Sequence, residues 1–346
     1  MKLKKFFAGV VAAAMMLTMG ATAAFAAEPS NTITINGKEY SDAQTVTVKK
    51  VYKLAGAGSS AKETFTLEQV GDGKVTDGDA KTAPHLGEII GAAFAEGAAT
   101  EAGATAEITI ALPTYEKVGV YEYTLKEVSN STAGVKYLDG TIKLVVSVVN
   151  GTNGQLRVAA VHTEGTSADG EKLAKSDLFT NTYTANSITV SKTVTGNLGD
   201  KTKEFSFTID FEKAEGENAP TGITYTVNDV AKTVTFGEDG KAQVKFTLTD
   251  GQTLNFANVP AGVKYTVSET SYADDGYTTK LNDVVGNTSG EKTMTAAAAT
   301  YAFENNKGGE IDTGVILDNA PYIALLAIVA FGGVALVLNK RRRDEE

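Results

Sequence analysis

Apolar and polar residues alternate through much of this chain, and the alternating stretches are rich in Val, Thr, Ile, Tyr and Phe. A period of two in such residues predicts β-strands with one buried face. Short clusters of Gly, Asn and Asp separate these stretches and predict turns. Many short strands with frequent turns are typical of antiparallel β-sandwiches, so we expect an all-β protein. The clearest predicted strands are 45–48, 141–148, 205–209 and 244–248.

One internal segment departs from this alternation. Residues 86–96 predict a short surface helix, and His85 directly precedes them. The second histidine, His162, ends an alternating segment. We expect both histidines to be solvated rather than catalytic.

The first 26 residues follow the pattern of a secretory signal. Lys2, Lys4 and Lys5 form a positive start, and residues 6–19 are apolar. Small residues at Ala24 and Ala26 then fit a cleavage site. The sequence therefore predicts a signal peptide over 1–26 and a mature chain that begins near Ala27.

The other end of the chain has the layout of a sorting signal. Residues 310–314 read Glu-Ile-Asp-Thr-Gly, and an uncharged run follows from 320. Its length is close to the ~20 residues with which a helix crosses a bilayer. We expect a transmembrane segment over 320–339 and a basic cytoplasmic tail over 340–346. A sortase would cut between Thr313 and Gly314; the alternative is an ordinary single-pass anchor that is never cut.

Composition narrows the classes of function. The chain carries a formal net charge of −10, which argues against nucleic acid as a partner. It has no cysteine and two histidines, which excludes a cysteine nucleophile and leaves little for a Ser-His-Asp triad. We expect no cofactor, no metal site and no turnover enzyme.

The mature chain contains a diverged internal repeat. The segment 47–51 recurs as 189–193, and 118–127 recurs as 261–269. A Phe-x-Asn segment at 179–181 also recurs at 303–305. Each repeat begins with a lysine strand and ends with an asparagine strand. We therefore expect an N-terminal domain over 27–185 and a C-terminal domain over 186–309, joined by a short linker.

Three polar residues in each repeat are predicted to point inward. Strand parity places each of them on the same face as apolar neighbours. A lone buried charge is costly, so each set should meet at one point. The sets are Lys50, Glu127 and Asn181, and Lys192, Glu269 and Asn305.

These residue types suit one reaction. Burial lowers the pKa of lysine and raises that of glutamate, so that the amine becomes nucleophilic and the carboxyl can carry a proton. Attack of the amine on the asparagine carboxamide, with Glu127 or Glu269 as the catalytic proton shuttle, would expel ammonia and leave an amide crosslink. The same polar set in the same order in both repeats favours this interpretation over solvated strand residues.

At these residues the chain resembles the backbone pilins of Gram-positive sortase-assembled pili, of the streptococcal two-domain type with intramolecular Lys–Asn isopeptide bonds. The resemblance covers the whole mature chain and implies two tandem immunoglobulin-like (CnaB-like) domains. Family sorting signals often read Glu-Val-Pro-Thr-Gly. Here Ile311 and Asp312 replace Val and Pro, whereas Thr313 and Gly314 are retained.

The resemblance also implies how subunits join. In this family a sortase links the C-terminal threonine of one subunit to a lysine that precedes the asparagine strand of the next. The possible acceptors here are Lys175 and Lys172, which we expect in a polar turn, with Lys175 favoured. The implied partners are other copies of the chain, the pilus sortase, cell-wall peptidoglycan and minor or tip pilins.

The sequence leaves alternative functions open. The first hypothesis is a structural shaft subunit on the cell surface. The second is a wall-anchored adhesin that is attached once and is never polymerised. The third, a secreted enzyme, is disfavoured because the chain lacks the common catalytic motifs.

Overall fold

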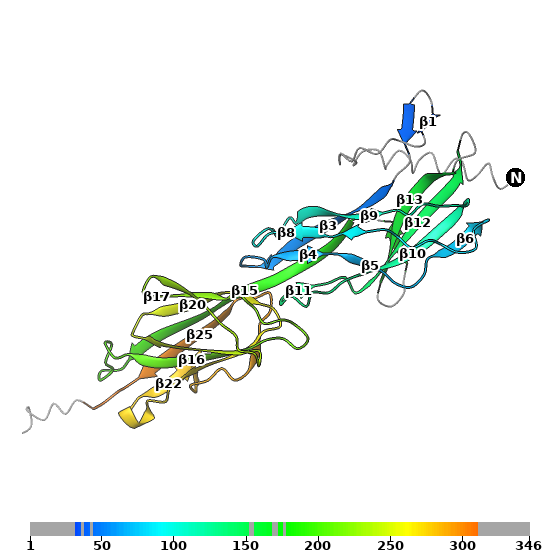
Figure 1. Ribbon diagram of the computed structural model, residues 1–346. Coiled ribbons are helices and arrows are strands. Elements are labelled where there is room, and N and C mark those ends of the chain that lie inside the picture. The colour runs from blue at the N-terminus through cyan, green and yellow to red at the C-terminus, as the bar shows by residue number, and fades with distance from the viewer. Residues whose placement is uncertain are drawn as a thin grey trace, which may run out of the picture.

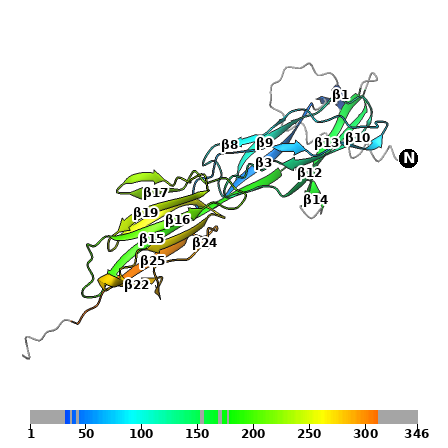
Figure 2. The same cartoon turned by 60° about the horizontal axis from the view of Figure 1, so that its bottom comes forward.

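The computed structural model describes residues 32–35, 38–41, 44–151, 156–167, 172–175 and 178–310. Two β-rich units lie end to end and give an elongated molecule (Figures 1 and 2). The expected signal peptide, the sortase residues Thr313 and Gly314, and the expected membrane segment lie outside the described residues. Within the described ranges, no helix is long and apolar enough to cross a membrane.

Strands dominate the described chain. The first unit contains β1 (Thr32–Ile35), β2 (Lys38–Ser41), β3 (Thr45–Gly56), β4 (Glu63–Phe65), β5 (Leu67–Gln69), β6 (Lys74–Gly78), β7 (Ile89–Ile90), β8 (Ala92–Phe94), β9 (Ala104–Ala111), β10 (Gly119–Glu127), β11 (Val135–Lys136), β12 (Gly140–Asn150), β13 (Leu156–Ser167) and β14 (Lys172–Lys175). β15 (Leu178–Thr195) runs through both units. The second unit contains β16 (Phe205–Glu212), β17 (Thr224–Val227), β18 (Val230–Thr233), β19 (Lys241–Leu248), β20 (Thr253–Pro260), β21 (Lys264–Glu269), the short 3-10 helix η2 (Ala273–Asp275), β22 (Thr278–Leu281), β23 (Val284–Val285), β24 (Lys292–Thr293) and β25 (Ala299–Asn306).

β15 is the element that organises the molecule. It is 18 residues long, and its first half pairs in parallel with β3 while its second half pairs in parallel with β25. The chain therefore passes position 185 inside a strand rather than in a separate linker. An 11-stranded sheet extends across both units because they share this strand (Figure 1).

Each unit is a sandwich of two sheets. In the first unit, one sheet has the order β14-β13-β12-β10-β5, and it faces the strands β15, β3, β9 and β7. In the second unit, the sheet β19-β16-β21-β24 faces the strands β20, β15, β25 and β22. This is the all-β sandwich that the alternation predicted, with the immunoglobulin-like architecture that the family resemblance implied.

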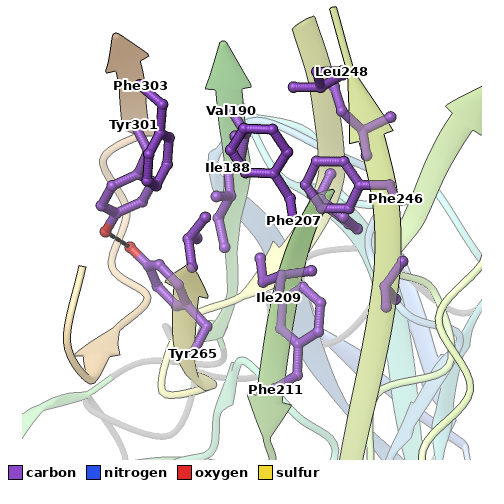
Figure 3. Close-up of a cluster of buried hydrophobic side chains, with 14 of the residues drawn as sticks. Ile188, Val190, Phe207, Ile209, Phe211, Phe246, Leu248, Tyr265, Tyr301 and Phe303 are labelled. Atoms are coloured by element: carbon purple, nitrogen blue, oxygen red, sulfur yellow. Dashed lines mark hydrogen bonds between the residues drawn. The ribbon is translucent and has the colours of Figure 1, made fainter. Parts of the chain in front are cut away.

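Aromatic and branched residues from both sheets fill the core of the second unit (Figure 3). Phe207 stacks on Phe246 with ring centroids 5.4 Å apart, and it meets Phe303 edge to face at 5.1 Å. The hydroxyls of Tyr265 and Tyr301 are hydrogen-bonded to each other at 2.9 Å, so each buried phenol has a polar partner. The first unit has its own core of the same kind.

The prediction of a helix over 86–96 was wrong. This segment forms β7 and β8, and Ala92 and Phe94 are buried while the residue between them is exposed. Pro84, Gly87 and Gly91 disfavour a helix interior, and pairing with β9 and β4 supplies the backbone with partners instead.

The two histidines differ from each other. The His85 side chain is 71% exposed and lies 3.2 Å from an Asp72 carboxylate oxygen. His162 lies inside β13, not at the end of a strand, and its Nε2 is 3.3 Å from Glu164 Oε1. His162 is therefore partly buried, which corrects the prediction that both histidines are solvated.

Hydrogen bonds between loops reinforce the junction between the units. Asn258, which adopts a left-handed backbone with φ 58°, accepts hydrogen bonds from the Ser59 N–H (3.1 Å) and the Tyr183 hydroxyl (3.2 Å). On the other side, Asn218 donates through its backbone N–H to the Ser131 carbonyl at 2.7 Å. These contacts resist bending about β15.

A glycine at the junction provides a first test. Gly56 has φ +87°, and a Cβ there would lie 2.1 Å from the Ala185 carbonyl oxygen. We expect Gly56→Ala to destabilise the protein by about 2–4 kcal/mol in chemical denaturation, because backbone clash adds to left-handed strain. Gly71→Ala is the matched control: Gly71 has φ +66° with nothing within 4 Å, so it should show only the strain, about 1 kcal/mol. Equal losses in the two variants would contradict the packing argument.

Candidate crosslinking sites

The first polar set meets between the two sheets of the first unit. Lys50 from β3 and Asn181 from β15 lie on adjacent parallel strands, and Glu127 reaches them from β10 in the opposite sheet. All three residues are buried, with 1% to 3% of their surface exposed. Lys50 Nζ forms an ion pair with Glu127 Oε1, and Asn181 Nδ2 donates to Glu127 Oε2 at 2.9 Å.

The second unit repeats this arrangement. Lys192 from β15 and Asn305 from β25 lie on adjacent parallel strands, and Glu269 faces them from β21. Lys192 Nζ donates to Glu269 Oε1 at 2.8 Å, and Asn305 Nδ2 donates to the same oxygen at 2.9 Å. Each glutamate thus contacts both the amine and the carboxamide nitrogen.

Aromatic rings surround both amines. Lys192 Nζ lies 4.1 Å from the centroid of the Phe205 ring, and Lys50 Nζ lies 5.1 Å from that of Phe65. The rings exclude water from the amines while their π-faces still attract a cation. Both amines therefore lie in apolar surroundings, and the adjacent rings help to hold them in place.

Burial also changes proton affinities. Desolvation lowers the pKa of Lys50 and of Lys192 from the usual lysine value, although the adjacent glutamates oppose the shift. Desolvation raises the pKa of Glu269, which the Lys192 hydrogen bond partly offsets. These shifts bring amine and carboxyl closer to exchanging a proton, as an amine nucleophile requires.

The sites contain polar atoms that lack hydrogen bonds. Among the described residues, Glu269 Oε2, Asn181 Oδ1 and Asn305 Oδ1 are buried without a hydrogen-bond partner. An unsatisfied buried polar atom typically costs ~1–3 kcal/mol, so native structures seldom keep one without a reason. The arrangement is consistent with groups that react with one another.

Comparison with known proteins supports this interpretation. Residues 46–184 match the family described as "Spy0128-like isopeptide containing domain", and residues 186–307 match a domain of unknown function. A pilin of Streptococcus pyogenes serotype M1 is 29% identical over 257 residues, which is 68% of this chain and 72% of that protein. This chain is a pilin homologue.

Two further similarities are more limited. The pilus tip adhesin Cpa of Streptococcus pyogenes is 39% identical over 135 residues, but the match covers only 18% of the adhesin. The crystal structure of the major pilin from Streptococcus pyogenes is 23% identical, with a TM-score of 0.49 over 77% of this chain and 99% of that chain.

Strand parity in this pilin homologue correctly predicted that all six polar residues are buried and that each set of three meets. It did not predict that β15 carries both Asn181 and Lys192. The inward face changes from odd to even positions between Ala185 and Ile188, where the pairing with β20 shifts register. This change of parity is visible in the sequence and is the signal that could have revealed the shared strand.

The predicted acceptor lysines lie in a strand, not in a turn. Lys172 and Lys175 begin and end β14, whose backbone pairs with β13 opposite Thr166 and Glu164. Their side chains lie outside what the structure describes. β14 is the last strand of its sheet, so one edge of its backbone is not paired within that sheet.

No group of three or more His, Asp or Glu side chains within the described ranges could hold a metal ion.

Proposed function

We propose that this pilin homologue is the structural shaft subunit of a covalently polymerised cell-surface pilus, stiffened by two self-formed Lys–Asn isopeptide bonds. The observation that carries the proposal is the pair of buried Lys–Glu–Asn sets placed in series on β15. Burying two lysines and two glutamates costs free energy, and a surface protein that formed no crosslink would gain nothing from these sets to offset that cost.

The chemistry at each site follows from the contacts of the glutamate. Glu127 accepts a proton from Lys50, and the neutral amine attacks the side-chain carbonyl carbon of Asn181. The new C–N bond forms as the bond to Nδ2 breaks. Glu127 delivers its proton to the departing nitrogen, which leaves as ammonia, and then accepts the proton that the attacking nitrogen loses as it becomes an amide. Glu269 plays the same part for Lys192 and Asn305. Each residue reacts once, so the glutamates are not turnover sites.

The crosslinks would act mechanically. Asn181 and Lys192 are 11 positions apart on one extended strand, a span of roughly 36 Å. Amides at both ends would join β3 to β15 and β15 to β25. A pulling force along the fibre would then pass through the amides and not through the hydrophobic cores. The chain between Lys192 and Asn305 could not be extended by that force.

Polymerisation uses one chain region just before Asn181 and another just after Asn305. In this proposal a pilus sortase cleaves after Thr313 and joins its carbonyl to Lys175, or to Lys172, of the next copy. The last subunit is attached to cell-wall peptidoglycan, and minor or tip pilins complete the fibre. The membrane segment holds the precursor until it is sorted.

Intact mass tests the proposal directly. Recombinant residues 28–309 should be lighter than the sequence mass by two ammonias, about 17 Da each. Changing Glu127 and Glu269 together to Ala should restore the sequence mass. A wild-type mass equal to the sequence mass would reject the isopeptide mechanism and favour the unpolymerised wall-anchored adhesin.

A further inference from the structure

Besides Glu127, the first unit contains two buried acids that the crosslinking reaction does not use, and Glu63 is the more deeply buried of them. Glu63 in β4 is 4% exposed. Its Oε2 accepts from the Tyr137 hydroxyl at 2.6 Å, and its Oε1 accepts from Asn130 Nδ2 at 2.6 Å and from the Thr64 N–H at 2.8 Å. Among residues 186–310, by contrast, the buried polar residues are those of the crosslinking set.

Tyr137 connects this acid to the reacting groups. Its hydroxyl donates to Glu63 and accepts from the Thr132 N–H at 3.3 Å, and its ring packs edge-on against Phe65. Burial, with help from Glu63, raises the pKa of Tyr137 to about 12. Tyr137 therefore remains a hydrogen-bond donor at neutral pH, and the loop that carries it is held at two points.

The next residue along that loop contacts the catalytic carboxylate. The Leu138 N–H donates to Glu127 Oε2, the same oxygen that accepts from Asn181 Nδ2. β11 begins the loop beside Asn181, because Lys136 pairs with Thr182 on β15. In the second unit, both donors contact Glu269 Oε1, and Glu269 Oε2 has no hydrogen-bond partner.

We propose that Tyr137 and Glu63 are positioning residues that hold the Leu138 N–H on Glu127, so that the first-unit crosslink forms more slowly than the second. This inference rests on the proposed Lys–Asn reaction. Neither positioning residue touches the amine or the carboxamide; both act through the loop.

The direction of the effect follows from electrostatics. An N–H that donates to a carboxylate favours its ionised form. A carboxylate stabilised by an additional donor is a weaker base and takes a proton from Lys50 less readily, and a protonated amine is not a nucleophile. Among the described residues, Lys50 forms an ion pair with Glu127, and Tyr137 and Glu63 act on it through the loop. The Glu269 oxygen that lacks a partner is free to carry the proton.

The experiment follows both crosslinks in the same molecules. The full chain is synthesised in a short cell-free pulse, chased at several pH values, quenched in denaturant and digested. The branched Lys50–Asn181 and Lys192–Asn305 peptides are then quantified against time. The variants are Tyr137→Phe and Glu63→Gln. Tyr123→Phe is the matched control, since it removes a buried hydroxyl that bonds to Tyr115 and does not touch the loop.

In the wild type we expect the second crosslink to form roughly three- to tenfold faster than the first. Both loop variants should accelerate the first crosslink and leave the second unchanged. They should also change the pH dependence of the first crosslink and leave that of the second unchanged, because the contact between the Leu138 N–H and Glu127 exists only in the first unit. The control should do neither.

Several results would overturn the inference. Equal wild-type rates would do so, as would loop variants that slow the first crosslink, abolish it or leave it unchanged. A shift of the rate in Tyr123→Phe as large as in Tyr137→Phe would assign the effect to general loosening of the core. Absence of both branched peptides from the wild type would instead reject the proposed reaction itself.

Discussion

Replacing Asn305 with Ala should lower the melting temperature of the second unit by roughly 15–25 °C. The proposed amide closes the chain between Lys192 and Asn305, and closing a loop of ~100 residues stabilises by ~4–5 kcal/mol if disulfide loop entropy is a fair analogue. The substitution also leaves the Lys192–Glu269 pair buried without the carboxamide, which adds to the loss. Calorimetry of residues 28–309 would measure the shift, and intact mass would show a gain of about 17 Da beyond the substitution itself.

Asn306→Ala is the matched control for this prediction. Asn306 is the next residue of β25, but it is exposed and its side chain donates to the Thr195 hydroxyl at the surface. We expect a change of less than about 1 kcal/mol and an unchanged ammonia deficit. Similar melting temperatures for the two variants would show that Asn305 forms no stabilising crosslink.

Changing both Lys172 and Lys175 to Arg should abolish high-mass ladders in cell-wall extracts of the producing strain. A guanidinium stays protonated at every accessible pH and cannot take the place of an amine nucleophile. The proposed transfer of the Thr313 carbonyl would then have no acceptor. Immunoblots of wall extracts would show monomer alone, whereas each single variant identifies which lysine reacts.

The control is Lys81→Arg, at an exposed position of the same unit. It should leave the ladders intact, because only a lysine presented to the sortase reacts. Ladders that persist in the double variant would show that a lysine other than Lys172 and Lys175 is the acceptor. A wild-type strain without ladders would favour the adhesin that is attached once.

The sequence determined the strand content and the buried polar residues of this protein. The period-two alternation fixes which side chains face the core, and parity alone placed Lys50, Glu127 and Asn181 inside with apolar neighbours. The repeat of the same three residue types in the same order then predicted the second site. Both predictions concern local periodicity, which a linear chain displays directly.

The tertiary structure decided what periodicity does not encode. Residues 86–96 form strands because pairing with β9 and β4 outweighs their weak helical pattern. β15 serves both units because a register shift near Asn186 turns its inward face without ending the strand. The Leu138 N–H reaches Glu127 only because β11 docks on β15. Each of these depends on contacts between segments that are distant in sequence, and the free energy of such contacts belongs to the pair rather than to either segment.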